Sequence, residues 1–212
     1  MENKVAVMPV APLGVNCIFL TNNKKQLVIV DPGGDADRIV DYIDEQQLVP
    51  AYIFLTHGHF DHVGAVSDLA TRFKIPVYAH AQDSATISNA HIQSRSFGID
   101  IDRVEVTEHF EDGQIIPFGE YEIRVIHTPG HSAGCVCFYI PQLSLLISGD
   151  TLFRDGIGRT DFPGSSTKAI LHSIQPKLFT LPDETVVIPG HGETTTIGHE
   201  AETNLYVIRQ GE

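Results

Sequence analysis

Residues 56–62 carry the densest group of potential metal ligands in this chain. They read Thr-His-Gly-His-Phe-Asp-His, between an apolar run at residues 52–55 and another at 63–66 that begins a helical pattern. Imidazole nitrogens and carboxylate oxygens are donors that divalent metals such as Zn, Fe and Mn accept. The spacing H-x-H-x-D-H therefore predicts a metal site formed by His57, His59, Asp61 and His62 at a strand-to-helix junction.

Three further potential ligands lie in the second half of the chain, each after an apolar run. His131 follows the run at residues 123–126, Asp150 the run at 145–148, and His191 the run at 186–188. Each is in or beside a turn that contains glycine, which lets the backbone bend sharply. Because the carboxyl ends of strands lie together at one edge of an α/β sheet, we expect these side chains to converge.

A set of histidines and aspartates of this kind is suited to hydrolysis. Metal-bound water reaches a pKa near ~7, so hydroxide is available at neutral pH. No Ser–His–Asp or catalytic Cys arrangement is evident in the sequence. Metal-bound hydroxide is therefore the expected nucleophile.

The composition limits the possible partners. With 14 Lys and Arg against 27 Asp and Glu, the formal net charge is −13, which argues against nucleic acid. No apolar run approaches the ~20 residues of a membrane-spanning helix, and the first residues lack a signal-peptide pattern. The odd set Cys17, Cys135 and Cys137 contains no C-x-x-C pair, so reduced thiols are expected. We expect a cytoplasmic protein that acts on a small molecule, away from membranes, with its oligomeric state left open.

The apolar periodicity predicts the elements that must position these residues. Strands are predicted at residues 4–10, 16–21, 26–30, 51–55, 104–106, 114–116, 121–126, 135–140, 143–148 and 185–188. Helices are predicted from a cap at Asp35 or Asp37 to Pro50, then at 63–73 before Pro76, at 165–179 and at 199–209. Residues 77–103 show only short helical pieces. The pattern predicts one α/β domain, residues 1–212, with two similar halves.

The order H-x-H-x-D-H, His131, Asp150 and His191 resembles the metallo-β-lactamase superfamily over nearly the whole chain. The resemblance implies a four-layer αββα sandwich with the site at one edge of two packed sheets. It implies two metal ions, most readily Zn, with Fe or Mn as alternatives. With two aspartates and a bridging hydroxide, two divalent ions would leave a net charge of about +1, which can stabilise an oxyanion. The implied ligands are His57, His59 and His131 for one metal and Asp61, His62 and His191 for the other, with Asp150 bridging.

The same resemblance implies roles for three aspartates. Asp31, directly after its strand, would support the metal ligands without binding the metal. Asp61 and Asp150 would orient the metal-bound hydroxide as well as bind metal.

Within the superfamily, the chain looks most like the glyoxalase II-like hydrolases, also called hydroxyacylglutathione hydrolases. The similar stretches are residues 31–34, 56–62, 128–131, 149–153 and 189–192, and residues 93–98 resemble a short bacterial subgroup. The resemblance implies hydrolysis of S-D-lactoylglutathione to D-lactate and glutathione. Metal-bound hydroxide would attack the thioester carbonyl.

The chain departs from classical glyoxalase II at the substrate site. We expect no C-terminal helical domain after Glu212, and the chain carries Arg159 and Asp161 where classical members have Lys and Tyr. The Arg159 guanidinium is expected to bind a substrate carboxylate. Asp161 cannot replace the Tyr, so glutathione specificity stays open.

Three alternatives follow from the sequence. Residues 158–162 resemble the loop of persulfide dioxygenases, which hold one iron through positions matching His57, His131 and Asp150, although those enzymes carry a small residue where Phe60 stands. A metallo-hydrolase of another ester, thioester or lactone is a second alternative, and a metal-binding or regulatory protein without turnover is a third. Secreted β-lactamases and RNA-processing members are disfavoured by the ligand set, the missing export signal and the acidic charge.

The remaining histidines lack the spacing of metal ligands. We expect structural or solvated roles for them: His80, His91, His109, His127, His172 and His199.

Overall fold

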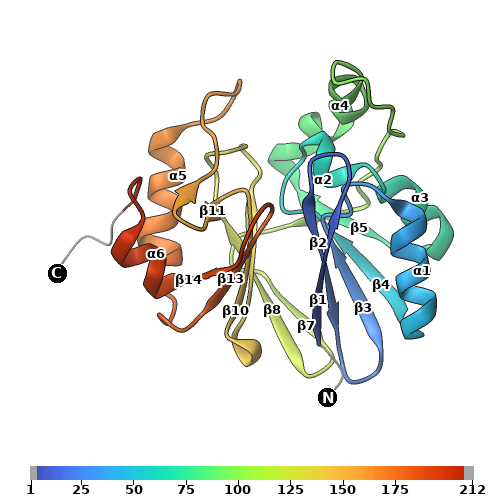
Figure 1. Ribbon diagram of the computed structural model, residues 1–212, viewed down its shortest axis with the longest axis horizontal. Helices are drawn as coiled ribbons and strands as arrows, with labels where there is room; N and C mark the ends of the chain where they lie inside the picture. The colour runs from blue at the N-terminus through green and yellow to red at the C-terminus, as the bar shows by residue number, and fades with distance from the viewer. Residues whose placement is uncertain (1–3, 208–212) are drawn as a thin grey trace. The chain divides into compact units, whose positions relative to one another are not determined.

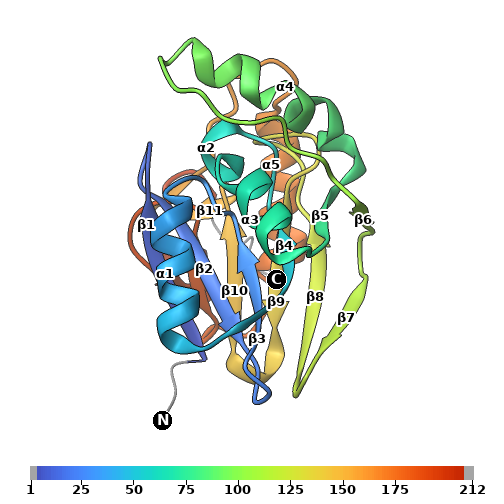
Figure 2. The same ribbon diagram turned by 90° about the vertical axis from the view of Figure 1, so that its right-hand side faces the viewer.

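The computed structural model describes residues 4–207, and the chain divides into two compact units, Met1–Phe110 and Glu111–Glu212. Each unit has its own six-stranded sheet (Figures 1 and 2). Each unit also has its own apolar core, in which helices pack against sheet residues. The two halves that the sequence predicts correspond to these units.

The sheet of the first unit has the strand order β1-β2-β3-β4-β5-β6. The first three strands pair antiparallel, and β3 to β6 pair in parallel. Strands β2 and β3 are nearly continuous buried apolar runs, which is typical of strands inside a sheet. The bounds are β1 Val5–Val10, β2 Val15–Thr21, β3 Gln26–Val30, β4 Val49–Phe54, β5 Val77–His80 and β6 Glu108–Phe110.

The helices of the first unit pack their apolar faces onto this sheet. Ile39 and Ile43 of α1 and Leu69 of α3 are buried in one cluster with sheet residues such as Ile29 and Ile53. The spacing of four residues puts Ile39 and Ile43 on one face of α1. The helices are α1 Ala36–Gln46, α2 Phe60–Val63, α3 Val66–Phe73, the 3-10 turn η1 Ala81–Asp83 and α4 Ser84–Arg95.

The sheet of the second unit has the order β14-β13-β10-β9-β8-β7, with a small separate pair of β11 and β12. Strands β10 and β13 are parallel, whereas the other neighbours in the large sheet are antiparallel. The bounds are β7 Ile115–Phe118, β8 Tyr121–His127, β9 Val136–Ile140, β10 Leu145–Gly149, β11 Leu152–Phe153, β12 Gly156–Ile157, β13 Val186–Pro189 and β14 Thr195–Thr196.

Two helices and a π-helical turn cover the core of the second unit. Ile170, Ile174 and Ile197 are buried against Leu146 and Val187 of the sheet. The elements are the 3-10 turn η2 Pro141–Leu143, α5 Thr167–Ser173, the π-helical turn η3 Ile174–Leu178 and α6 Ile197–Thr203. No helix within residues 4–207 is long and apolar enough to cross a membrane.

Several predicted boundaries are wrong for identifiable reasons. The first helix ends at Gln46, where Gln47 takes a left-handed conformation, and Pro50 lies inside β4. Asp35 stands at the cap position, but its side chain does not cap the helix. Its Oδ2 accepts from the N–H of Ala11 and pairs with Arg38.

Three other segments also differ from the prediction. Residues 104–106 are not a strand, although Val104 is buried; the strand begins at Glu108. The helix predicted over 165–179 changes to a π-helical turn because Pro176 has no N–H to continue the α-helical ladder. Residues 77–103, expected as short pieces, contain β5 and the 12-residue helix α4. The last helix begins at Ile197 and ends at Thr203, so residues 204–207 of the predicted range 199–209 are not helical, and the predicted end at Arg209 lies outside the described residues.

Candidate metal centre

Residues 56–62 follow β4 after one residue, Leu55, and run into α2, so they lie at the predicted strand-to-helix junction. His57 and His62 are almost completely buried, and Asp61 is 7 % exposed. Strand β4 is parallel to β3, and the Asp31 N–H donates to the carbonyl oxygen of Phe54 at 3.0 Å. The pairing brings Asp31, at the end of β3, to the start of the histidine segment.

Asp31 organises this segment through its carboxylate. Oδ1 accepts from the Thr56 N–H at 2.7 Å, and Oδ2 accepts from the Thr56 hydroxyl at 2.5 Å and from Nδ1 of His62 at 2.9 Å. Because the Thr56 hydroxyl gives its proton to Asp31, its oxygen accepts from Nδ1 of His57, 3.1 Å away. In the neutral rings, Nε2 of both His57 and His62 therefore keeps its lone pair for a metal.

The donor atoms of the first unit suit metal binding. Nε2 of His57 and Nδ1 of His59 are 3.0 Å apart, and Nε2 of His62 is 3.8 Å from Oδ2 of Asp61. Ligands at about 2.0–2.1 Å around a tetrahedral zinc stand about 3.3–3.4 Å apart. The spacing of each pair is close to that value, so both pairs fit a divalent ion.

A glycine and a buried aspartate hold the backbone of these ligands. A Cβ on Gly33 would collide with the carbonyl oxygen of Asp61, so only glycine permits this approach. The N–H of Gly58, between the first two histidines, donates to Oδ2 of Asp83 at 2.8 Å. Asp83 directly precedes α4 and is 1 % exposed. The sequence analysis missed Asp83, because no local spacing connects it to residue 58.

In the second unit, His131, Asp150 and His191 lie after the ends of β8, β10 and β13. Strands β10 and β13 are parallel, and the Gly190 N–H donates to the Gly149 carbonyl oxygen at 2.8 Å. Oδ2 of Asp150 is 3.4 Å from Nε2 of His131 and 3.9 Å from Nε2 of His191. The structure thus brings these three predicted ligands together around one carboxylate.

His131 is held by the main chain. Its Nδ1 lies 2.8 Å from the carbonyl oxygen of Arg159. A carbonyl can only accept, so Nδ1 carries the proton and Nε2 offers its lone pair towards Asp150. A Cβ on Gly158 would collide with the carbonyl oxygen of Asp150 and would come within 3.0 Å of Cβ of His131.

Arg159 and Asp161, at the substrate positions inferred from the sequence, bind each other. Nε and Nη2 of Arg159 donate to the two carboxylate oxygens of Asp161 at 3.0 and 2.8 Å. The guanidinium also lies 4.4 Å from the ring centroid of Phe162. The hydrogen bond from Arg159 lowers the pKa of Asp161, and the same bond raises the pKa of Arg159.

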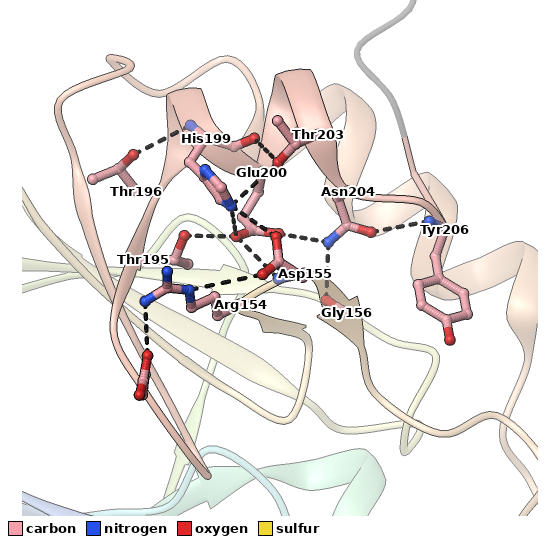
Figure 3. Close-up of polar contacts among 11 residues, drawn as sticks. Arg154, Asp155, Gly156, Thr195, Thr196, His199, Glu200, Thr203, Asn204 and Tyr206 are labelled. Carbon is pink, nitrogen blue, oxygen red and sulfur yellow. Dashed lines mark hydrogen bonds and ion pairs between the residues drawn. The ribbon is translucent and has the colours of Figure 1, made fainter.

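A second polar cluster anchors the turn after β11 (Figure 3). The buried carboxylate of Glu200 accepts from Thr195 Oγ1 at 2.6 Å, from the Asp155 N–H at 3.0 Å and from Asn204 Nδ2 at 2.7 Å. Nε2 of His199 lies 2.7 Å from Oδ1 of Asp155. His199 therefore has a structural role, and the hydrogen bonds to Glu200 already occupy both of its oxygens.

Arg154 connects the same turn to the segment after His191. Its Nη1 is 2.7 Å from Oε2 of Glu193. The turn that follows Asp150 is thus tied to the chain that follows His191, and these contacts help to keep the two predicted ligands in place. Nothing in the local sequence signals this network, since bonded partners such as Asp155 and Glu200 are 45 residues apart.

Three other histidines have contacts of their own away from these donors. His127 Nε2 donates to the Ala133 carbonyl oxygen at 2.9 Å, and Nδ1 of His109 donates to the Ala79 carbonyl oxygen at 3.3 Å. Nδ1 of His80 accepts from the Gln82 N–H at 3.4 Å and caps η1. Structural roles account for these three side chains.

The chain is similar to known proteins over almost its whole length. A family model described as the metallo-beta-lactamase superfamily matches residues 10–191. The hydroxyacylglutathione hydrolase GloC of Haemophilus influenzae is 34 % identical over 206 residues, which cover 96 % of this chain and 97 % of that protein.

Two solved structures are similar over almost their whole length. The BLEG-1 B3 metallo-beta-lactamase has a TM-score of 0.89 and 38 % identity, with 95 % of this chain and 98 % of that chain covered. TTHA1623 in a di-iron-bound form has a TM-score of 0.87 and 37 % identity, with 95 % and 99 % covered.

Proposed function

We propose a reaction for this chain on the premise that it belongs to the metallo-β-lactamase superfamily, a membership shown by the family model and by its full-length relative. The predicted fold class, the α/β sandwich of that superfamily, is confirmed by the same comparisons and by the solved structures. The chain is accordingly a metallo-hydrolase with clustered His and Asp ligands.

The proposed reaction is the hydrolysis of a glutathione thioester, in the first place S-D-lactoylglutathione. Water attacks the thioester carbonyl, the carbon–sulfur bond breaks, and D-lactate and glutathione leave. One observation carries this proposal: the similarity to a hydroxyacylglutathione hydrolase extends over 96 % of the chain. Arg159 supports it, because its main-chain carbonyl holds His131 and its guanidinium can bind a substrate carboxylate.

We propose that two divalent metal ions are held by the seven residues inferred from the sequence: His57, His59, Asp61, His62, His131, Asp150 and His191. Such ions, when bound, lower the pKa of water and polarise a carbonyl group. The protein contributes orientation: Asp31 fixes the ring tautomers of His57 and His62, and the Arg159 carbonyl fixes that of His131. Asp61 and Asp150 would orient the attacking water by accepting its hydrogen bonds.

Zinc is the proposed metal, and iron is the first alternative. Imidazole and carboxylate ligands accept Zn, Fe and Mn. Iron gains support from the di-iron form of the similar protein TTHA1623. Metal analysis of the purified protein should find two ions per chain.

Histidine variants test the metal centre. His59→Ala should lower metal content and thioesterase activity together, because it removes a donor 3.0 Å from His57 Nε2. His80→Ala is the matched control and should leave both unchanged, since that ring only caps a 3-10 turn. Two bound metals without cleavage of any glutathione thioester would contradict the proposed reaction.

A β-lactam is the second candidate substrate, because the similar structure with a TM-score of 0.89 is named a B3 metallo-beta-lactamase. A chromogenic cephalosporin assayed beside S-D-lactoylglutathione distinguishes the two. Persulfide dioxygenation is tested in the same series by oxygen uptake with glutathione persulfide and the iron-loaded protein. We expect the largest kcat/KM for the thioester.

A further inference from the structure

The loop at residues 158–162 presents an ion pair to solvent. Arg159 and Asp161 are 67 % and 66 % exposed, and two parallel hydrogen bonds of 3.0 and 2.8 Å join them. Phe162 backs the guanidinium at 4.4 Å. The aromatic ring and the bidentate contact limit the conformations of both side chains. The positive and the negative charge therefore keep fixed positions relative to each other.

This ion pair is attached to predicted metal ligands of the same unit. The Arg159 carbonyl oxygen accepts from Nδ1 of His131, and the Phe162 ring lies edge-on to the His131 ring at 5.8 Å. The Gly158 N–H donates to the Thr151 carbonyl oxygen at 3.3 Å, one residue after Asp150. A substrate bound at these ligands would therefore meet the ion pair.

The pair leaves complementary groups available. The contacts to Asp161 use Nε and Nη2 of Arg159, so the N–H groups of Nη1 can still donate to a carboxylate. Each oxygen of Asp161 can still accept a further hydrogen bond. A ligand with only negative charge would be attracted by the Arg159 guanidinium but repelled by the Asp161 carboxylate. A ligand with adjacent ammonium and carboxylate groups would match both residues.

We propose that Arg159 and Asp161 together recognise the α-amino-acid end of the substrate, with the carboxylate on Arg159 and the ammonium on Asp161. This inference rests on the proposed thioesterase function and assigns a role to Asp161 in selecting substrates. The γ-glutamyl end of glutathione has this chemistry. The proposal explains how a residue that cannot replace the Tyr of classical members can still favour a glutathione conjugate.

The test compares two thioesters that differ only at the ammonium group. S-D-lactoylglutathione and its N-acetylated form are assayed with the wild type, Asp161→Asn and the control Glu122→Gln. The control removes an exposed carboxylate 3.3 Å from Arg124, so it matches the charge change. Acetylation should lower kcat/KM about fivefold in the wild type and control, a typical size for an exposed charge pair, and by less than twofold in Asp161→Asn.

Binding of the products gives a readout without turnover. Calorimetry of glutathione and N-acetylglutathione with the same three proteins should show the same pattern in Kd. An equal effect of acetylation in the wild type and Asp161→Asn would overturn the recognition of the ammonium group, even if the thioesters are cleaved. Absence of any thioester cleavage would instead contradict the proposed function. The ratio of the Kd values of glutathione and N-acetylglutathione would then decide the role of Asp161. Failure of glutathione to bind the wild type would overturn the inference directly.

Discussion

The predicted ligands of the first unit lie in one short stretch of chain, whereas those of the second unit follow three separate strands. In the first unit a side chain, the carboxylate of Asp31, orients two histidines. In the second unit a main-chain carbonyl orients His131, and a glycine allows the close approach of Asp150. In this protein the rings of the compact motif are therefore fixed by one buried side chain. Ligands on separate strands are fixed by the loops between them.

The largest expected effect comes from Asp31. Asp31→Asn keeps the left-handed backbone conformation, φ 50°, that Asn tolerates, but it offers one acceptor oxygen where three donors converge. We expect metal affinity to fall about 10- to 100-fold and the free energy of unfolding to fall by about 2 kcal/mol. Metal titration and denaturant unfolding measure these changes.

Asp35→Asn is the matched control, since Asp35 also has a positive φ but lies at the surface beside Arg38. It should change neither metal affinity nor stability by more than about 0.5 kcal/mol. If Asp31→Asn kept the metal affinity of the wild type, the ligands of the first unit would not depend on a buried side chain, and the proposed difference between the two units would be wrong.

A smaller effect is expected from the main-chain restraint of the second unit. Gly158→Ala places a methyl group against the carbonyl oxygen of Asp150 and Cβ of His131, so the loop must shift. We expect about tenfold lower kcat/KM and about 1–3 kcal/mol lower stability. Gly156→Ala is the control, because its nearest contacts would be 3.8 Å away. Equal kinetics for the two variants would show that Gly158 does not restrain the ligands.

The contrast between these restraints also explains how much the sequence could reveal. The H-x-H-x-D-H segment was found because its ligands are close along the chain. His131, Asp150 and His191 were found because each follows a recognisable apolar run. Asp83 and Glu200 were missed, since their contacts depend on how distant elements pack, which leaves no local spacing.

The fold, too, could be predicted where the signal is local and not where it depends on distant contacts. The long apolar strands were located to within one or two residues, and strand β3 matches its predicted bounds. Val104 is apolar and buried, yet its segment pairs with no strand, because burial alone does not fix hydrogen-bond partners. Pro50 was expected to end a helix but occupies β4, since Gln47 had already stopped the helix.

The smallest expected effect concerns Asp112, which is 52 % exposed. Burial raises the pKa of this carboxyl, but hydrogen bonds from the His127 N–H and Lys177 outweigh it, so the pKa lies below 3.8. A lowered folded-state pKa contributes stability above the unfolded value, and this contribution is lost as the pH falls through the folded pKa. Asp112→Asn should therefore cost about 0.5 kcal/mol or less at pH 7 after solvent screening, and nothing at the acid end.

Unfolding of the wild type and Asp112→Asn measures the difference when it is followed from pH 7 to about pH 2, because the stabilisation is lost only below the unfolded pKa of about 4. A stability difference that grows in acid would contradict the sign of the pKa shift. Together with Asp31→Asn, the experiment compares a buried carboxylate with an exposed one.

The π-helical turn at Ile174–Leu178 has a consequence for insertions and deletions. There the Phe179 N–H donates to the Ile174 carbonyl oxygen, five residues back, so the turn accommodates one residue more than an α-helical turn. Lys177 in this turn donates to the His127 carbonyl oxygen at 2.6 Å, at the end of β8. Deleting a single residue before Lys177 would rotate it by about 100° around the helix axis and remove it from β8. Relatives that lack this residue would need another cation to hold the strand from which the turn to His131 begins.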